Sequence, residues 1–253
     1  MPQASDMAGK AALVTGAASG LGRATALALA RAHADICLVD VNEAGLRDAA
    51  EEVRALGVRT HIAPTDLADP AACRAAVAAA VEAFGRLDAL CNVAGVLVFA
   101  HTAAMSLADW QKTLAVNLSA PFLLAQAAIP HLLERNGAIV NVTSTATDQG
   151  EAYAAAYCAT KAGLTQLTKA LAMEYMRQPI RINAVAPGGM ATAISRSTKL
   201  PEDADMGLVN RYMPMRGLVE VDDVAGMIAF LASDAARGHH GACIFIDNGV
   251  TAG

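Results

Sequence analysis

The sequence lacks the features that mark secreted, metal-dependent and membrane-spanning proteins. Its five cysteines form no C-x-x-C pair and are odd in number, so we expect no disulfide framework and a reducing, cytoplasmic location. The six histidines show no metal-ligand spacing, and we therefore expect no metal site. The chain has no apolar run of about 18 residues, and residues 1–10 hold no apolar signal core. These absences predict a protein without a membrane partner.

Positive charge and linker-like sequence are also scarce. The 19 lysines and arginines are outnumbered by 24 aspartates and glutamates, and the formal charge of -5 argues against nucleic acid as a partner. No stretch rich in proline, glycine or serine divides the 253 residues. Hydrophobic residues make up 55%, which is enough for a large buried core. We therefore expect a single domain spanning residues 1–253.

Apolar runs and helix-forming stretches alternate along the whole chain. Strands are predicted near residues 11–15, 35–39, 58–63, 87–92, 137–143, 180–185 and 242–246. Helices are predicted near residues 20–32, 43–56, 70–84, 106–134 (bent at Pro121), 155–176 and 222–232. This alternation predicts an α/β fold: a single-domain, Rossmann-like, doubly wound parallel sheet of about seven strands with helices on both faces.

A glycine-rich turn follows the first predicted strand. Residues 15–22 read T-G-A-A-S-G-L-G, and a good helix-forming stretch begins directly after them. Glycines let the chain bend sharply and let a pyrophosphate approach main-chain N–H groups, while a helix N-terminus adds partial positive charge. The alternative is a tight turn that needs small residues only for packing. Between a strand and a helix, the G-x-x-x-G-x-G spacing favours a dinucleotide site.

An acidic residue closes the second predicted strand. Asp40 lies where a carboxylate can accept hydrogen bonds from the adenosine ribose hydroxyls and repel a 2′-phosphate. Neither Ser19 nor Val41 offers a positive charge to hold such a phosphate. The alternative role for Asp40 is to cap the next helix, but Asn42 can fill that role. The sequence therefore predicts NAD as the cofactor, with NADP disfavoured.

A tyrosine and a lysine are spaced to share one face of the fifth predicted helix, near residues 155–176. Tyr157 and Lys161 are four residues apart, and Ser144 precedes the tyrosine by thirteen. A nearby ammonium lowers the pKa of a phenol, which suits proton transfer near neutral pH. Asn117 lies in an apolar helical run and must find buried hydrogen-bond partners. The alternatives are a solvated helix face for the pair, a strand-end cap for Ser144 and a helix-bending contact for Asn117.

These residues belong to a longer series of motifs in a fixed order along the chain. The series comprises residues 15–22, Asp66, Asn92-Val93-Ala94-Gly95, Asn117, Ser144, Tyr157 with Lys161, and Pro187-Gly188. Its residue types, spacing and order resemble those of the short-chain dehydrogenase/reductase family over nearly the whole chain.

The resemblance implies a role for each of these residues. Tyr157 would be the general acid or base at the substrate oxygen, Lys161 would bind the nicotinamide ribose, and Ser144 would hold the substrate oxygen. Asn117 would anchor a water in a proton relay behind the lysine, which completes a catalytic set of Asn117, Ser144, Tyr157 and Lys161. The expected cofactor-binding residues are Gly16, Ser19, Gly20, Leu21, Gly22, Asp40, Asp66, Leu67, Asn92, Ala94, Gly95, Tyr157, Lys161, Pro187, Gly188, Met190 and Thr192.

The expected activity is reversible hydride transfer between nicotinamide and a small-molecule secondary alcohol or ketone. The substrate is expected to be mainly apolar because residues 189–214, which should cover it, are rich in methionine, leucine and isoleucine. Residues 190–214 are predicted to form a lid. The resemblance also implies a homotetramer or homodimer. The alternatives are an NADPH-dependent 3-ketoacyl reductase, disfavoured by Asp40, and a non-catalytic dinucleotide-sensing or scaffold protein, disfavoured by the intact serine, tyrosine and lysine.

Overall fold

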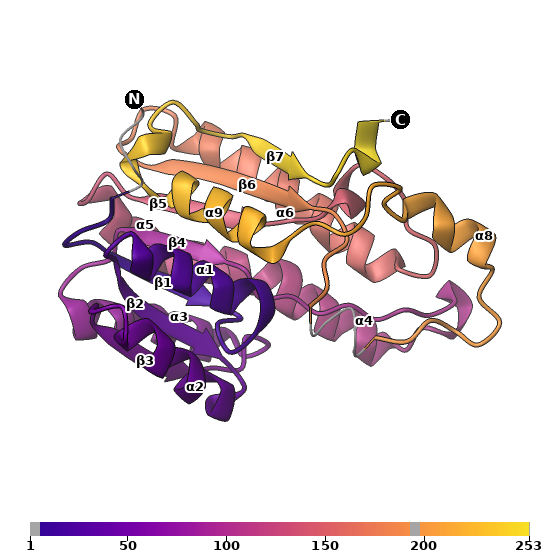
Figure 1. The fold of residues 1–253 in the computed structure, drawn as a ribbon, viewed down its shortest axis with the longest axis horizontal. Helices are drawn as coiled ribbons and strands as arrows, with labels where there is room; N and C mark the ends of the chain where they lie inside the picture. The colour runs from indigo at the N-terminus through magenta and orange to yellow at the C-terminus, as the bar shows by residue number, and fades with distance from the viewer. Residues whose placement is uncertain (1–5, 193–197, 253) are drawn as a thin grey trace.

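The sheet that organises the molecule is fully parallel (Figure 1). The computed structural model describes residues 6–192 and 198–252. Its strands are β1 (Ala11–Thr15), β2 (Asp35–Asp40), β3 (Thr60–Pro64), β4 (Ala89–Asn92), β5 (Ala138–Val142), β6 (Arg181–Pro187) and β7 (Cys243–Ile246). They lie in the order β3-β2-β1-β4-β5-β6-β7, and every neighbouring pair runs parallel. The doubly wound fold predicted from the sequence is confirmed.

Helices cover both faces of the sheet. They are α1 (Gly20–Arg31), α2 (Glu43–Arg54), α3 (Pro70–Phe84), α4 (Leu107–Leu114), α5 (Ala120–Leu133), α6 (Ala155–Glu174), α8 (Met206–Val209) and α9 (Val221–Ala232). In Figure 1, α1, α2 and α9 lie in front of the sheet, and α3, α5 and α6 lie behind it. Each face has its own buried cluster: one includes Leu29 of α1 and Ile228 of α9, and the other includes Val77 of α3 and Leu124 of α5.

The fourth predicted helix differs from the expectation of one bent rod. It is divided into α4, a π-helical turn over Ala115–Ser119, and α5. Pro121 has no N–H to donate to the carbonyl of Asn117 four residues earlier, so the regular α-helical ladder cannot run through this point. The interruption therefore falls just before the proline. It gives Asn117 an irregular backbone of the kind often found at functional sites.

The same stretch is apolar for a structural reason. Leu107–Leu133 is long and apolar enough to cross a membrane by length and composition, with a mean hydropathy of 1.3 over its best window. Half of that window is buried inside the protein. Leu124 and Leu132 are almost fully inaccessible in the cluster that α5 shares with α3. Core packing thus accounts for much of the hydropathy of this segment.

Candidate active site

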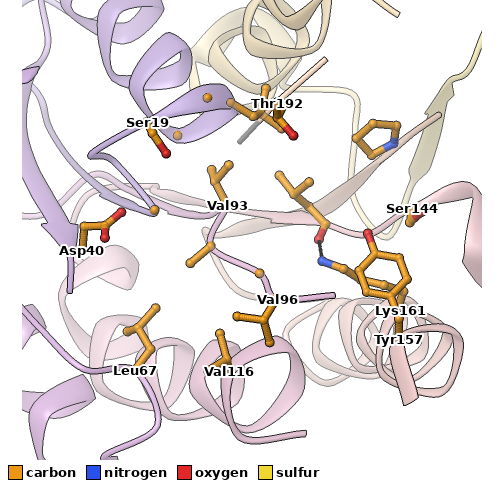
Figure 2. Close-up of a pocket in the computed structure, with 18 of the residues that line it drawn as sticks. Ser19, Asp40, Leu67, Val93, Val96, Val116, Ser144, Tyr157, Lys161 and Thr192 are labelled. Atoms are coloured by element: carbon orange, nitrogen blue, oxygen red, sulfur yellow. Dashed lines mark hydrogen bonds between the residues drawn. The ribbon is translucent and has the colours of Figure 1, made fainter. Parts of the chain in front are cut away.

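A cavity of about 430 Å³ lies at the carboxyl ends of the central strands. The strand order changes direction between β1 and β4, and ligands of doubly wound sheets bind at such a switch point. Figure 2 shows Ser19 and Asp40 at one end of the cavity, and Ser144, Tyr157 and Lys161 at the other. Segments from six strand ends thus contribute to one elongated site.

The glycine turn is shaped by close backbone contacts. A Cβ atom on Gly22 would lie 2.0 Å from the carbonyl oxygen of Gly16, so no larger residue fits without moving the chain. Gly16 has φ +70°, and a Cβ there would lie 3.0 Å from Cα of Ala94. Ser19 occupies the N-cap position of α1, but its side chain makes no capping hydrogen bond. The N-terminus of α1 therefore opens on the cavity with its N–H groups, as a pyrophosphate requires.

Two acids mark the end of the cavity beside the glycine turn. Asp40 accepts hydrogen bonds from the N–H groups of Ala18 (3.2 Å) and Asn42 (2.9 Å), one on each carboxylate oxygen. Each oxygen keeps a lone pair for a ligand hydroxyl. Asn42, rather than Asp40, caps α2 by accepting from the N–H of Gly45 at 3.1 Å. Asp66 lines the same end and accepts from the N–H of Ala68 at 2.9 Å.

The structure does not bring the side chain of Asn92 to the cavity lining. Its amide donates to Oδ1 of Asn141 at 2.8 Å, and Asn141 donates in turn to Thr168 at 2.9 Å. The two asparagines are in register on β4 and β5, so the amides meet across the sheet and lie buried against α6. A sequence reading that placed both strands could pair them, but the resemblance alone assigned Asn92 to the cofactor.

The remaining cofactor residues predicted from the sequence all line the cavity. At the β6 end, a Cβ atom on Gly188 would lie 2.9 Å from Cα of Asp247, so the chain there also needs a glycine. Thr192 stands opposite the glycine turn, with its Cβ 3.5 Å from where a Cβ on Gly20 would be. Val96, which the sequence placed after the fourth strand as a cleft residue, also lines the cavity. The lining residues that sequence reasoning did not assign are Val41, Thr65, Val93, Lys112, Val116, Val142 and Thr143. Most are apolar and carry no chemical signature in the sequence.

Thr15 holds the turn after β4 in place. Its hydroxyl oxygen accepts hydrogen bonds from the N–H groups of Val93 (2.9 Å) and Ala94 (3.0 Å). The contact ties the end of β1 to the loop after β4, on the two sides of the switch point. Sequence reasoning included Thr15 in the glycine turn but gave it no such function.

At the other end of the cavity, Ser144, Tyr157 and Lys161 converge (Figure 2). Ser144 is 7% exposed, and its hydroxyl accepts from the N–H of Ala146 at 3.2 Å. Lys161 is 3% exposed, and its ammonium donates to the carbonyl oxygen of Val142 at 2.8 Å. The predicted face-sharing of the tyrosine and lysine is present, with the ammonium 5.6 Å from the ring centre.

The protonation of this group differs from the expectation. Burial raises the pKa of Tyr157 to about 12, against the hydrogen bond from Ser144, which lowers it. Burial lowers the pKa of Lys161 to about 8. The sequence reading considered the lysine charge and left out desolvation, which acts on both groups and favours their neutral forms. The expected downward shift of the tyrosine pKa is therefore not found in the protein alone.

Asn117 lies behind the lysine, fully buried in the π-helical turn. Its amide oxygen accepts from the N–H of Val96, and its amide nitrogen donates to the carbonyl oxygen of Val96, both at 2.8 Å. The nitrogen also donates to the hydroxyl of Thr160 at 3.2 Å. A Cβ on Gly95 would lie 3.5 Å from both the Asn117 oxygen and the Lys161 nitrogen. Asn117 thus fixes the loop beside Lys161, while the water relay implied by the resemblance stays a prediction.

A long connection between β6 and α9 stands beside the catalytic end. Its two ends are joined where Val219 donates to the carbonyl oxygen of Gly189 at 2.9 Å. Within it, Asp205 donates from its N–H to the hydroxyl of Tyr153 at 2.8 Å, and Tyr212 donates to the carbonyl oxygen of Ala152 at 3.2 Å. Of the predicted lid over 190–214, residues 193–197 lie outside the described residues. The rest includes the short helix α8, which was not predicted.

The cavity lies at the switch point of a doubly wound sheet. It runs from the N-terminus of α1 to a buried phenol and ammonium. This arrangement is typical of dinucleotide-binding oxidoreductases. Comparison with known proteins agrees with this class. A family model described as "Enoyl-(Acyl carrier protein) reductase" matches residues 16–251. The chain belongs to the short-chain dehydrogenase/reductase family.

Similar proteins include both named enzymes and solved structures. The chain is 39% identical to 2,5-dichloro-2,5-cyclohexadiene-1,4-diol dehydrogenase LinX of Sphingobium indicum over 251 residues, which covers 99% of each chain. It superposes on a Burkholderia cenocepacia short-chain dehydrogenase in complex with NADP with a TM-score of 0.88, at 33% identity, covering 97% of this chain and 99% of that one. The TM-score is also 0.88 with Mycobacterium avium carveol dehydrogenase in complex with NAD, at 29% identity, covering 98% and 100%.

Proposed function

We propose that the protein is an NAD-dependent dehydrogenase that transfers hydride between nicotinamide and the carbinol carbon of a secondary alcohol, or the carbonyl carbon of the ketone. The convergence of Ser144, Tyr157 and Lys161 at one end of a dinucleotide-shaped cavity carries this proposal. A bound oxidised nicotinamide would accept the hydride and add a positive charge at this end of the cavity. The dehydrogenase names of the relatives support the same reaction class.

The protein's own residues would hold the substrate oxygen and move its proton. Ser144 and Tyr157 both reach the position of a carbinol oxygen from the cavity wall. In oxidation, the hydroxyl proton passes to the Tyr157 oxygen as the carbonyl forms. Because burial raises the pKa of Tyr157 to about 12, the phenolate needs nearby positive charge, which protonated Lys161 provides. Lys161 also binds the nicotinamide ribose in this proposal.

The proposed preference for NAD rests on Asp40. Its carboxylate lines the end of the cavity opposite Tyr157, where it can accept from ribose hydroxyls and repel a 2′-phosphate. Of the described residues that line the cavity, the cations are Lys112 and Lys161, which come from α4 and α6 and not from the end that carries Asp40. An NADPH-dependent 3-ketoacyl reductase is the alternative, and the same carboxylate disfavours it.

The remaining parts of the proposal concern substrate and assembly. Val96, Val116 and Met190 line the cavity and support a mainly apolar substrate, and residues 190–214 would act as its lid. We also propose a homotetramer or homodimer formed through α4, α5 and α6. Leu107 (69% exposed) on α4 and Phe122 (43% exposed) on α5 support this pairing. Five free cysteines support a reducing, cytoplasmic location.

Replacing the proposed proton acceptor tests the reaction. Tyr157→Phe keeps the packing of the ring and removes the ionisable oxygen. It should retain NAD binding by calorimetry and lose at least about a hundredfold in kcat for a panel of secondary alcohols, followed by the absorbance of reduced nicotinamide. Tyr175→Phe, at the distant end of α6, is the matched control and should keep full activity. A folded Tyr157→Phe protein with more than about a tenth of the wild-type kcat would contradict the assignment.

A further inference from the structure

The turn that follows β7 has no role in the function proposed above, although it lies at the carboxyl edge of the sheet (Figure 1). The carboxylate of Asp247 accepts from the N–H of Gly249 (2.9 Å) and from the N–H (2.9 Å) and hydroxyl (2.6 Å) of Thr251. Between them, Asn248 has φ +53°, a left-handed conformation that asparagine tolerates better than most residues. These contacts fix the turn and hold Asn248 in one orientation.

The side chain of Asn248 joins this turn to the end of the β6–α9 connection. Its amide nitrogen donates to the carbonyl oxygens of Gly217 (3.0 Å) and Leu218 (3.1 Å), which are consecutive in the chain. An amide nitrogen carries two hydrogens, so both can be used here. The carboxylate of an aspartate has nearly the same shape, but it has no donor and would repel both carbonyl oxygens. The contact therefore depends on the chemistry of the amide and not only on the size of the side chain.

The end of the connection packs directly on the loop after β6. A Cβ atom on Gly189 would lie 3.2 Å from Cδ2 of Leu218. The next residue, Val219, donates from its N–H to the carbonyl oxygen of Gly189 at 2.9 Å and pairs with Met190 in a parallel β-bridge. A shift of residues 217–219 would therefore move the loop that carries Met190.

The C-terminal turn contacts the same loop from a second side. A Cβ atom on Gly188 would lie 2.9 Å from Cα of Asp247, and the N–H of Gly188 donates to the carbonyl oxygen of Ile246 at 2.9 Å. Gly188 and Met190 both line the cavity. The loop after β6 is thus held between two segments, and the side chain of Asn248 joins these segments to each other.

We propose that Asn248 is a positioning residue for the nicotinamide end of the cofactor, because its two hydrogen bonds keep Gly188 and Met190 in place on the cavity wall. The inference rests on the proposed function, which puts the nicotinamide beside this loop. The cavity lining does not include Asn248, so its effect passes through the end of the connection. The end of the cavity that carries Asp40 and the glycine turn is formed by other segments and should not respond.

The test compares the binding of NAD with that of ADP-ribose, which lacks the nicotinamide, to the full-length protein in calorimetry at neutral pH. Asn248→Asp removes both donors and repels both carbonyl oxygens. It should weaken NAD binding roughly five- to thirtyfold, as the loss of one to two hydrogen bonds predicts, and leave ADP-ribose binding within about twofold. Asn248→Gly suits the left-handed backbone and removes the same donors without repulsion, so it should weaken NAD binding by a smaller factor.

Asn136→Asp is the matched control. Asn136 is also exposed and also has φ +53°, but it lies in the turn before β5, at the opposite edge of the sheet. This variant should change the affinity for neither ligand. A second measurement needs no ligand: the amide of Val219, which donates to Gly189, should exchange roughly fivefold faster in both Asn248 variants than in the wild type.

The outcomes separate this inference from the proposed function. Weaker NAD binding with unchanged ADP-ribose binding supports the role of Asn248, and it does so even if no secondary alcohol is oxidised, in which case the dehydrogenase proposal alone fails. The role is overturned if variants shown to be folded by thermal melting bind NAD like the wild type, or lose affinity for both ligands equally. If Asn248→Asp does not fold, Asn248→Gly decides. A wild type that binds no NAD overturns both proposals.

Discussion

The two ends of the cavity are built in different ways. At the cofactor end, main-chain atoms form the walls: the carbonyl of Gly16 leaves no room for a side chain at Gly22, and Asp40 is fixed by two N–H groups. At the substrate end, side chains join segments that are far apart in sequence, as in the contacts of Tyr153 with Asp205 and of Tyr212 with Ala152. The shape of the cofactor end is thus set by backbone geometry, and the shape of the substrate end is set by side chains that other residues could replace.

This difference separates the class of reaction from the choice of substrate. A backbone-lined pocket accepts few substitutions, but what it recognises is common to every dinucleotide. A pocket walled by side chains can change its ligand one residue at a time without disturbing the sheet. If the proposed function holds, the reaction class should depend on the backbone-lined end of the cavity and the choice of substrate on the side chains of the other end.

The comparison predicts that a single added methyl group has a large effect at the cofactor end and almost none at the other end. Gly22→Ala places a Cβ 2.0 Å from the carbonyl oxygen of Gly16, and the glycine turn must move to admit it. Gly150→Ala, near the substrate end, meets nothing within 4 Å. Because overpacking costs about 1–3 kcal/mol, Gly22→Ala should weaken NAD binding by roughly 5- to 150-fold in calorimetry. The Gly150 variant should bind NAD like the wild type, and equal affinities for the two variants would contradict the distinction.

Changing the acid at the cofactor end should redirect the enzyme between cofactors. Asp40→Ser with Val41→Arg removes the repulsion of a 2′-phosphate and adds a cation at an exposed position, since Val41 is 73% exposed. The ratio of kcat/KM for NADP to kcat/KM for NAD should rise roughly thirtyfold, which corresponds to about 2 kcal/mol of transition-state free energy. Val41→Arg alone is the control and should give a smaller shift. A wild type that uses NADP as well as NAD would show that the interpretation of Asp40 is wrong.

The features that the sequence predicted correctly are mostly those set by short-range backbone rules. The fold, the glycine turn and the residues past the strand ends were predictable because local rules fix them: alternation of strands and helices, glycine at crowded turns, and polar residues at carboxyl edges. Asn42 as the cap of α2 was also predictable, since its side chain reaches only its own helix. These features depend on neighbours within a few residues.

The parts that escaped prediction depend on contacts between distant segments. The side chain of Asn92 turned to Asn141, 49 residues away, and the pKa of Tyr157 was set by burial that no local pattern reveals. Glu151 stands in a loop with no motif, and it is burial in the folded chain that raises its pKa to about 7. Ser144, Tyr157 and Lys161 could be named from the sequence, but their burial and the contacts between distant segments are visible only once the chain is folded.

The buried acid at the substrate end should lower stability at high pH. Folding raises the pKa of Glu151 from 4.5 to about 7, so between these values the folded state binds more protons than the unfolded state. Stability then falls as pH rises through this window and levels off above it. Glu151→Gln has no such titration, so its stability relative to the wild type should increase by about 1–2 kcal/mol between pH 5 and pH 8 in urea unfolding. A difference that is the same at both pH values would contradict burial as the cause.

The smallest expected effect tests whether single side-chain contacts hold the substrate end. Tyr153→Phe keeps the ring, which packs edge-on against His101 at 5.0 Å, and removes the oxygen that accepts from the N–H of Asp205. Since one neutral hydrogen bond contributes about 1 kcal/mol, amide exchange over α8 should become roughly fivefold faster. Addition of NAD and substrate should slow the same amides in the wild type if residues 190–214 close as a lid.

In the exchange experiment on Tyr153→Phe, the variant Tyr175→Phe, far from α8, is the control. Because β1 and α1 share none of these contacts, their amides should exchange at the wild-type rate in both variants. An α8 that exchanges at the wild-type rate without the Tyr153 hydroxyl would mean that this end, too, is held by its backbone.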